Sequence, residues 1–439
     1  MPAEYVETLV IGGGQAGLSV SHMLSQAGCR HLVLERARIA ERWRTERWDG
    51  LRFQFPNWSV KLPDFPFPHA DPDGFATSEE IVDFLAAYAE FIAVPIRCGV
   101  AVTRLSRRPG ASGFIAETAD GAIESANVVV ATGPYQRALV PALLPAALDL
   151  FQVHASTYRA PDQLPPGAVL VVGSGASGAQ IAEELHRAGR RVYLSVGHHR
   201  RMPRRYRGRD LIWWISTLGL DQTTPVERRG PDKALPLITG AYGGHTIDFR
   251  AFSAQGITLL GRLVAAENGI VEIAPDLAAS LAAGDRSYAG FLDMVDGYIA
   301  QHGLDMPQDP DARATLPDPP CLVQPLRRLD LREADISAVI WSTGYGCDFS
   351  WIDVPVLDAR GEPVHSDGVT AVRGLYFIGL QWLASSRFGK PTRHIRRTPS
   401  APPAGHAGSC GRARTARIGC ASNAGAPGKE TSPRSSGLS

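Results

Sequence analysis

Residues 5–17 read YVETLVIGGGQAG, an alternating and then continuous apolar run that stops at a cluster of glycines. The apolar part is typical of a buried parallel β-strand. An amphipathic segment at 18–27 follows and is closed by Gly28, and a second apolar run at 31–34 leads into Glu35. This order of strand, glycine turn, helix, strand and acid predicts a βαβ unit that binds a dinucleotide.

Three glycines of this first turn have separate physical roles. Gly12 permits the tight turn out of the strand, Gly14 lets a pyrophosphate approach the backbone, and Gly17 lets helix and strand pack closely. The helix N-terminus offers unpaired N–H groups to the phosphates, and Glu35 can accept hydrogen bonds from a ribose diol. The alternative is a glycine-rich turn of an ordinary α/β domain, but the complete unit favours dinucleotide binding.

A second unit of the same kind begins near Gly167. The apolar run 168–172 leads into a turn that reads GSGASG at 173–178. A helical segment at 179–188 and a second apolar run at 191–195 complete it. Two such units are stronger evidence for dinucleotide binding than one.

The second unit differs from the first at the end of its second strand. No acid ends that strand, and residues 197–205 read GHHRRMPRR. An arginine here, Arg200 or Arg201, suits a ribose 2′-phosphate, which a carboxylate would repel, so the sequence favours NADPH over NADH. A solvated basic loop and a polyanion patch are the alternatives. His198 and His199 have no partner at metal-ligand spacing, so we expect no metal site.

The composition is that of a soluble globular protein of two or three domains. Of its 439 residues, 44% are hydrophobic and 20% are charged. Ten Lys and Arg but a single acid follow position 380, which leaves 35 basic and 43 acidic residues in the body, a charge near −8. This balance does not favour nucleic-acid binding. The chain has no basic leader, no membrane-length apolar run and no CxxC among its six cysteines, so we expect a cytoplasmic protein without stable membrane insertion.

Several other segments carry structural predictions. Short strand-like runs within 99–125 predict an antiparallel meander inserted into the first domain, and later apolar runs at 336–341 and 375–380 are expected to return to the first sheet. Ser78 is expected to cap a helix, and residues 287–302 predict another.

Residues 36–68 hold seven aromatic side chains among many prolines. This composition predicts an irregular, packed loop. The rings can simply pack the loop, or as a group they can wall an apolar pocket over a flat cofactor.

The two glycine turns and two strand ends, Ala131-Thr132-Gly133 and Ser342-Thr343-Gly344-Tyr345, resemble the class B flavin-dependent monooxygenases. The chain is most similar to the bacterial flavoproteins of the flavin-containing monooxygenase type. The runs DFPFP at 64–68 and FQVHASTY at 151–158 carry the same resemblance, which covers about residues 5–384.

Two features depart from the family pattern. His154 and Tyr158 match the family's fingerprint before the second turn, but Leu148 and Leu150 stand where Phe and Gly are expected. After about Ala384 the sequence changes to a tail dominated by Arg, Ala, Gly, Pro and Ser. We predict that this tail is disordered and that an altered reading frame has removed the family's last helix.

The resemblance implies an α/β fold with two Rossmann-like domains. A discontinuous FAD domain with the inserted β-meander would span 1–162 and 326–384, an inserted NADPH domain 163–325, and the tail 385–439. NADPH would reduce the flavin, and a C4a-hydroperoxyflavin formed with O₂ would oxygenate a small organic substrate. A flavin NAD(P)H dehydrogenase or reductase without oxygen transfer, and an inactive nucleotide-binding protein, stay open as alternatives.

The resemblance also implies roles for particular residues. The family's asparagine beside the flavin falls at Gln54, with Asn57 nearby, and both amides are kept as catalytic candidates. Motifs and resemblance together give these candidate cofactor-binding residues: Gly12, Gly14, Gln15, Ala16, Gly17, Glu35, Arg36, Trp43, Val102, Ala131, Thr132, Gly133, Gly173, Ser174, Gly175, Ser177, Gly178, Arg200, Arg201, Thr343, Gly344 and Tyr345.

Overall fold

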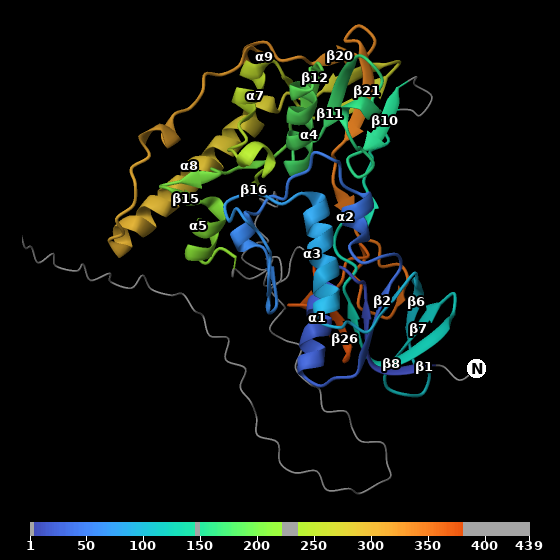
Figure 1. Cartoon of the computed structure of the whole chain (residues 1–439). Helices are drawn as coiled ribbons and strands as arrows, with labels where there is room; N and C mark the ends of the chain where they lie inside the picture. The colour runs from blue at the N-terminus through green and yellow to red at the C-terminus, as the bar shows by residue number, and fades with distance from the viewer. Residues whose placement is uncertain (1–3, 145–149, 222–235, 381–439) are drawn as a thin grey trace, which may run out of the picture. The chain divides into compact units, whose positions relative to one another are not determined.

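The computed structural model describes residues 4–144, 150–221 and 236–380. Within these residues the chain builds two sheets with parallel cores, each organised around one of the predicted βαβ units (Figure 1). The tail predicted at 385–439 and its altered frame lie outside the described residues. No described helix combines the length and the apolarity that a membrane span needs.

The first sheet is built around β1 (Glu4–Ile11). β1 pairs in parallel with β2 (His31–Glu35) and with β8 (Gly121–Val130), and α1 (Gln15–Gln26) connects β1 to β2. The predicted strand at 375–380 is confirmed in this sheet as β26 (Leu375–Phe377), which pairs with β8. The other strands are β5 (Ile96–Cys98), β6 (Val102–Arg107), β7 (Phe114–Thr118), β23 (Ile352–Asp353), β24 (His365–Ser366) and β25 (Val369–Thr370).

The predicted meander is confirmed in β6, β7 and β8, which pair antiparallel in chain order. One detail differs from the sequence prediction. The last strand of the meander does not end near residue 125: β8 continues to Val130 and pairs antiparallel with β7 on one edge and parallel with β1 on the other. A strand has hydrogen-bonding groups on both edges, so one segment can belong to a meander and to a parallel core at once.

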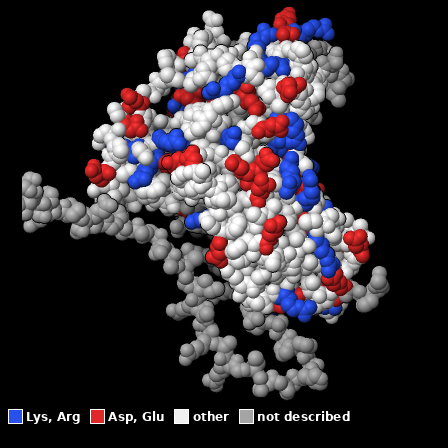
Figure 2. All heavy atoms as spheres, viewed as in Figure 1, with Lys and Arg blue, Asp and Glu red and all other residues white. Residues whose placement is uncertain are grey.

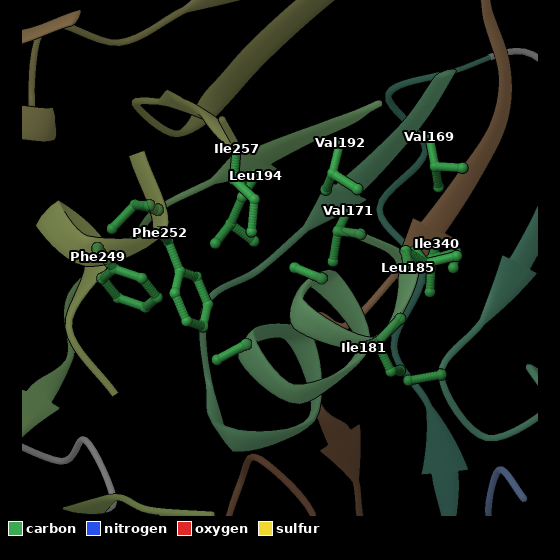
Figure 3. Close-up of a cluster of buried hydrophobic side chains, with 14 of the residues drawn as sticks. Val169, Val171, Ile181, Leu185, Val192, Leu194, Phe249, Phe252, Ile257 and Ile340 are labelled. Atoms are coloured by element: carbon green, nitrogen blue, oxygen red, sulfur yellow. The ribbon is translucent and has the colours of Figure 1, made fainter. Parts of the chain in front are cut away.

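The second sheet has the strand order β10-β21-β11-β12-β17, and all its pairs are parallel. The second βαβ unit supplies β11 (Ala168–Val172), α4 (Ala176–Arg187) and β12 (Val192–Ser195). Figure 3 shows the cluster of apolar side chains between helix and sheet, and Val171, Ile181 and Leu194 in it are fully buried. The remaining strands are β10 (Phe151–His154), β17 (Thr258–Leu260) and β21 (Ile336–Trp341).

The expectation that the strand at 336–341 joins the first sheet is wrong. β21 lies between β10 and β11 in the second sheet. An apolar run indicates a buried parallel strand but does not say which of two similar sheets receives it. Since β10 also lies in this sheet, we propose that the second domain extends from about residue 151 to about residue 341, beyond the range 163–325 expected from the sequence.

Two helices differ from their predicted starts. α3 (Ser78–Phe91) is capped by Thr77, not by Ser78: Glu80 N donates to Thr77 Oγ1 at 3.0 Å, and Thr77 N donates to the Glu80 carboxylate at 2.7 Å. This reciprocal capping box satisfies two backbone N–H groups. α8 (Leu277–His302) begins ten residues before the predicted start, at a run rich in Ala and Leu that favours helix.

The remaining elements are short, and several of their strands form small separate sheets of two or three strands. They are α2 (Glu41–Thr45), η1 (Asn57–Ser59), β3 (Lys61–Leu62), β4 (Phe65–Pro66), β9 (Arg137–Ala138), η2 (Pro161–Gln163), β13 (Arg200–Arg201), β14 (Arg205–Tyr206), β15 (Arg209–Asp210), α5 (Leu211–Thr217), β16 (Pro236–Leu237), η3 (Ala241–Gly243), α7 (Phe249–Gln255), β18 (Leu263–Glu267), β19 (Ile270–Ile273), η4 (Pro310–Arg313), α9 (Pro320–Val323), β20 (Arg328–Asp330) and β22 (Tyr345–Gly346).

Candidate functional site

The first glycine turn, Gly12–Gly17, is closely packed on one side and open on the other. Gly12 has φ +112°, and a Cβ there would lie 2.6 Å from Ala131 O. A Cβ on Gly17 would lie 1.9 Å from Gly12 O. Both positions therefore exclude any side chain. A Cβ on Gly14 would meet no protein atom within 4 Å, so the backbone is open where a pyrophosphate would approach.

Glu35 ends β2 directly beside this turn. Its carboxylate accepts hydrogen bonds from Gly13 N at 2.7 Å and from Ala37 N at 3.0 Å. Each carboxylate oxygen keeps a further lone pair after these bonds. Glu35 is thus held in place by the backbone and can still accept hydrogen bonds from ribose hydroxyls, which fits the role expected from the sequence.

The second glycine turn, Gly173–Gly178, repeats this geometry. A Cβ on Gly173 (φ +106°) would lie 2.4 Å from Ser342 O, and one on Gly178 would lie 1.9 Å from Gly173 O. Gly175 is exposed, and a Cβ there would meet no protein atom within 4 Å, as at Gly14 in the first turn. Ser174 is buried, and its Oγ accepts a hydrogen bond from Gly197 N at 3.0 Å. Its hydroxyl therefore ties the turn to the loop after β12.

Each glycine turn contacts the end of a neighbouring strand, at the motif ATG (131–133) for the first turn and STGY (342–345) for the second. Ala131 follows β8 and touches the first turn, and the Thr132 and Gly133 oxygens accept hydrogen bonds from Gln136 Nε2. Ser342 follows β21 and touches the second turn. Because β21 lies in the second sheet, its end lies at the second turn, with Thr343 N 3.5 Å from the position of a Gly173 Cβ. Gly344 O accepts from His154 Nε2, and Tyr345 pairs with Ala138 of β9. The Thr343 hydroxyl donates to Leu139 O.

The two arginines considered for a 2′-phosphate lie in different environments. Arg201 is 9% exposed, its guanidinium forms ion pairs with Asp248 at 2.5 Å and Asp285 at 3.1 Å, and it lies over the Tyr288 ring. A phosphate would compete there with two carboxylates, which argues against a binding role for Arg201. Arg200 precedes it in β13 and is partly exposed.

The two candidate catalytic amides, Asn57 and Gln54, differ in the hydrogen bonds that their side chains make. Asn57 Nδ2 donates to Asp71 O at 2.9 Å, so this amide holds its own loop together. The side chain of Gln54 makes no hydrogen bond to any residue that the structure describes, whereas its backbone oxygen accepts one from Arg204 Nη1 at 2.8 Å. This arrangement favours Gln54 as the amide that is available to a ligand.

The aromatic loop at 36–68 packs against itself and against α3, where Phe65 and Phe67 meet Phe84 at 5.5 and 5.1 Å between ring centres. Trp48, Phe53 and Phe67 are buried, and the partly buried Trp43 meets Phe53 edge to face at 5.5 Å between ring centres. Packing of the loop therefore accounts for these rings.

The other sequence candidates are placed as follows: Gln15 and Ala16 begin α1, Ser177 lies in the first turn of α4, Arg36 is exposed after Glu35, and Val102 begins β6.

His154 and Tyr158 support the second unit from inside. His154 Nδ1 accepts from Ser156 N at 3.1 Å, so Nε2 carries the proton and donates to Gly344 O at 3.1 Å. The hydroxyl of Tyr158, which is fully buried, donates to the Glu184 carboxylate of α4 at 2.8 Å. His154 therefore holds the backbone at Gly344, and Tyr158 holds α4 through the Glu184 side chain.

We predict that acid destabilises the protein through His154. Burial lowers the pKa of His154 and of His199 below the ordinary value near 6.5. The unfolded chain therefore takes up protons that the folded chain does not, and stability falls as the pH falls through about 6.5. Melting temperatures between pH 7.5 and 5.5 measure this slope. His154→Gln should reduce the slope, whereas Thr157→Ala should leave it unchanged, because the Thr157 hydroxyl donates to the His154 backbone oxygen at 3.0 Å and not to the imidazole. An unchanged slope in His154→Gln would contradict the prediction.

Sequence reasoning missed one buried charged residue next to the site. Arg204 is 2% exposed and pairs with Asp210. A basic loop normally indicates solvated side chains, so only the spacing of six residues between Arg204 and an acid could have pointed to the pair.

On the face shown in Figure 2, acidic and basic side chains are interspersed.

Comparison with known proteins agrees with this geometry. The family described as pyridine nucleotide-disulphide oxidoreductase matches residues 9–218. An uncharacterised CzcO-like oxidoreductase of Geobacillus kaustophilus is 34% identical over 384 residues, which are 86% of this chain and 91% of that protein.

Solved structures share the fold. A flavin-containing monooxygenase from Stenotrophomonas maltophilia matches with a TM-score of 0.60 at 19% identity, over 89% of this chain and 96% of its own. The bacillithiol disulfide reductase of Bacillus cereus matches with a TM-score of 0.54 at 15% identity, over 85% and 90%. The expected α/β fold and the expected resemblance are confirmed. The chain belongs to the family of CzcO-like oxidoreductases.

Proposed function

We propose that this protein is an FAD- and NADPH-dependent monooxygenase that uses O₂ to oxygenate a small organic substrate. One observation carries the proposal: two glycine turns with the same open geometry, one followed by an acid and the other by a basic loop. The acid suits the ribose of FAD, and the basic loop suits the 2′-phosphate of NADPH. The fold shared with a bacterial flavin-containing monooxygenase supports this choice. The cytoplasm is the compartment we propose for it.

The residues on each turn fit the proposed cofactors. The open backbone at Gly14 and the N-terminus of α1 would bind the FAD pyrophosphate, and Glu35 would accept from its ribose. The second turn and Arg200 would bind NADPH. When bound, FAD supplies the electron transfer from NADPH to O₂. Gln54 would donate a hydrogen bond to the flavin ring, and the packed aromatic loop would keep water from it.

A spectroscopic sequence tests the proposal. Purified protein with FAD should show bound-flavin absorbance, NADPH should bleach it without oxygen, and air should restore it. With a panel of amines, sulfides and ketones, at least one compound should yield oxygenated product in an amount that matches NADPH consumption. A colourless protein that binds no FAD would exclude the proposal and favour an inactive nucleotide-binding protein.

A flavin reductase is the second candidate function. The fold shared with a bacillithiol disulfide reductase favours it. The chain has no CxxC pair, which a dithiol mechanism would use. Peroxide in an amount equal to the NADPH consumed, with every compound of the panel left unchanged, would select the reductase.

We predict that Arg200 and Arg201 respond differently to alanine. Arg200→Ala should weaken NADPH binding about tenfold and leave NADH binding unchanged, because only NADPH carries the 2′-phosphate. Arg201→Ala should instead destabilise the protein by about 3 kcal/mol, because Asp248 and Asp285 lose their partner. Anaerobic flavin reduction at varied NADPH and NADH concentrations measures the first effect, and urea unfolding measures the second. Equal losses for NADPH and NADH in Arg200→Ala would contradict the assignment.

A further inference from the structure

Arg204 is buried at the point where the aromatic loop meets the chain that follows the second unit. Its Nε and Nη2 donate to the Asp210 carboxylate at 2.8 to 2.9 Å in a bidentate pair. Asp210 also accepts from Ile212 N at 2.8 Å and so caps α5. Because the pair is bidentate and the acid is held by a helix end, the plane of the guanidinium is fixed.

The third nitrogen of Arg204 contacts a different part of the chain. Nη1 donates to Gln54 O at 2.8 Å and to Thr239 O at 3.3 Å, and the guanidinium lies over the Phe75 ring at 4.7 Å. Gln54 and Phe75 lie before α3, whereas Thr239 lies after the second unit. One buried side chain therefore joins two segments that are distant in the sequence.

The same two segments also pack closely at two glycines of the second segment. A Cβ on Gly240 would lie 2.0 Å from Phe53 O, and a Cβ on Gly244 would lie 2.5 Å from the Phe75 ring. These contacts restrict the loop on one side, while Arg204 holds the next carbonyl, that of Gln54, by a hydrogen bond. The direction in which the Gln54 side chain leaves the backbone is thus set by Arg204 together with this packing.

We infer that Arg204 is a positioning residue that holds the Gln54 amide in place for the reaction. The inference rests on the proposed function, in which Gln54 faces the flavin. A buried ion pair contributes little net stability on its own, but it can select one conformation among several. Selecting the conformation of the Gln54 backbone is the role that the geometry supports here.

Arg204→Lys tests the inference, because lysine keeps the charge but cannot serve a carboxylate and two carbonyls with one planar group. Hydrogen exchange of the peptide covering residues 52–60, measured without FAD, should become at least about fivefold faster. Arg207→Lys is the matched control: Arg207 pairs with Asp296, and among the described residues it does not contact the Gln54 loop. Its exchange in this peptide should stay at the wild-type rate.

A double-mutant cycle tests the link to function. In air without substrate, two electrons from NADPH reduce O₂ to H₂O₂, and peroxide per bound FAD can be measured directly. Arg204→Lys and Gln54→Ala should each raise this rate about fivefold. The double variant should be no faster than either single variant, because both changes remove the proposed hydrogen bond from the Gln54 amide to the flavin. Asp210→Asn, which keeps the cap acceptor, should act in the same direction if Arg204→Lys does not fold.

The outcomes separate the inference from the proposed function. Additive effects, or unchanged peroxide release and unchanged exchange in variants that bind FAD fully, would overturn the role of Arg204 alone. A wild-type protein that binds no FAD, or whose FAD is not reduced by NADPH, would overturn the proposed function and this inference together.

Discussion

Replacing Gly14 with alanine is expected to yield a folded protein that has lost most of its affinity for FAD. Gly14 has φ −81° and ψ −175°, which alanine adopts without strain, and its Cβ would meet no protein atom within 4 Å. The methyl group would instead stand where the pyrophosphate must approach the backbone. We expect FAD affinity to fall about a hundredfold, while the melting temperature of the FAD-free protein stays at the wild-type value. Flavin titration by fluorescence and thermal unfolding measure the two effects.

Gly175→Ala is the matched control for this prediction. Gly175 occupies the equivalent open position of the second turn, with φ −67° and ψ −179°. Its replacement should leave FAD binding intact and weaken only the binding of NADPH. If Gly14→Ala bound FAD as tightly as the wild type, the first turn would not be the pyrophosphate site. Loss of FAD in Gly175→Ala would reverse the assignment of the two turns.

Replacing Gly17 with alanine is expected to destabilise the fold itself. Its Cβ would lie 1.9 Å from Gly12 O, a backbone atom that cannot rotate away. α1 would have to move off β1, and we expect a loss of about 3 kcal/mol in the free energy of unfolding. Urea unfolding followed by tryptophan fluorescence measures the loss, and FAD binding should weaken with it because the turn is displaced.

Gly28→Ala is the control that separates two causes of lost stability, the collision of a Cβ with a neighbouring atom and the strain of a positive φ. Gly28 has φ +66° with no atom near its Cβ position, so alanine should cost only about 1 kcal/mol there. An equal loss at the two positions would mean that close packing is not what requires glycine at Gly17.

Much of the candidate site could be predicted because its signals are local in the sequence. A strand, a glycine turn, a helix and a terminal acid are consecutive, so their geometry follows from neighbouring residues. Gly12, Gly17, Gly173 and Gly178 all lie where a side chain would collide with the backbone, as the motif requires. Glu35 likewise ends its strand beside the first turn. The position of the meander followed from alternation and turn residues, which are local as well.

The sequence by itself thus determined the two nucleotide-binding units and their order. Only the tertiary structure decided how β21 pairs, because an apolar strand fits either parallel sheet and its partners lie far away in the chain. Only it distinguished Arg201, which is buried against two acids, from its neighbour Arg200. Arg204 and Gln54 are 150 positions apart. Pairings over such distances depend on how whole elements pack, and no local pattern of residues records that packing.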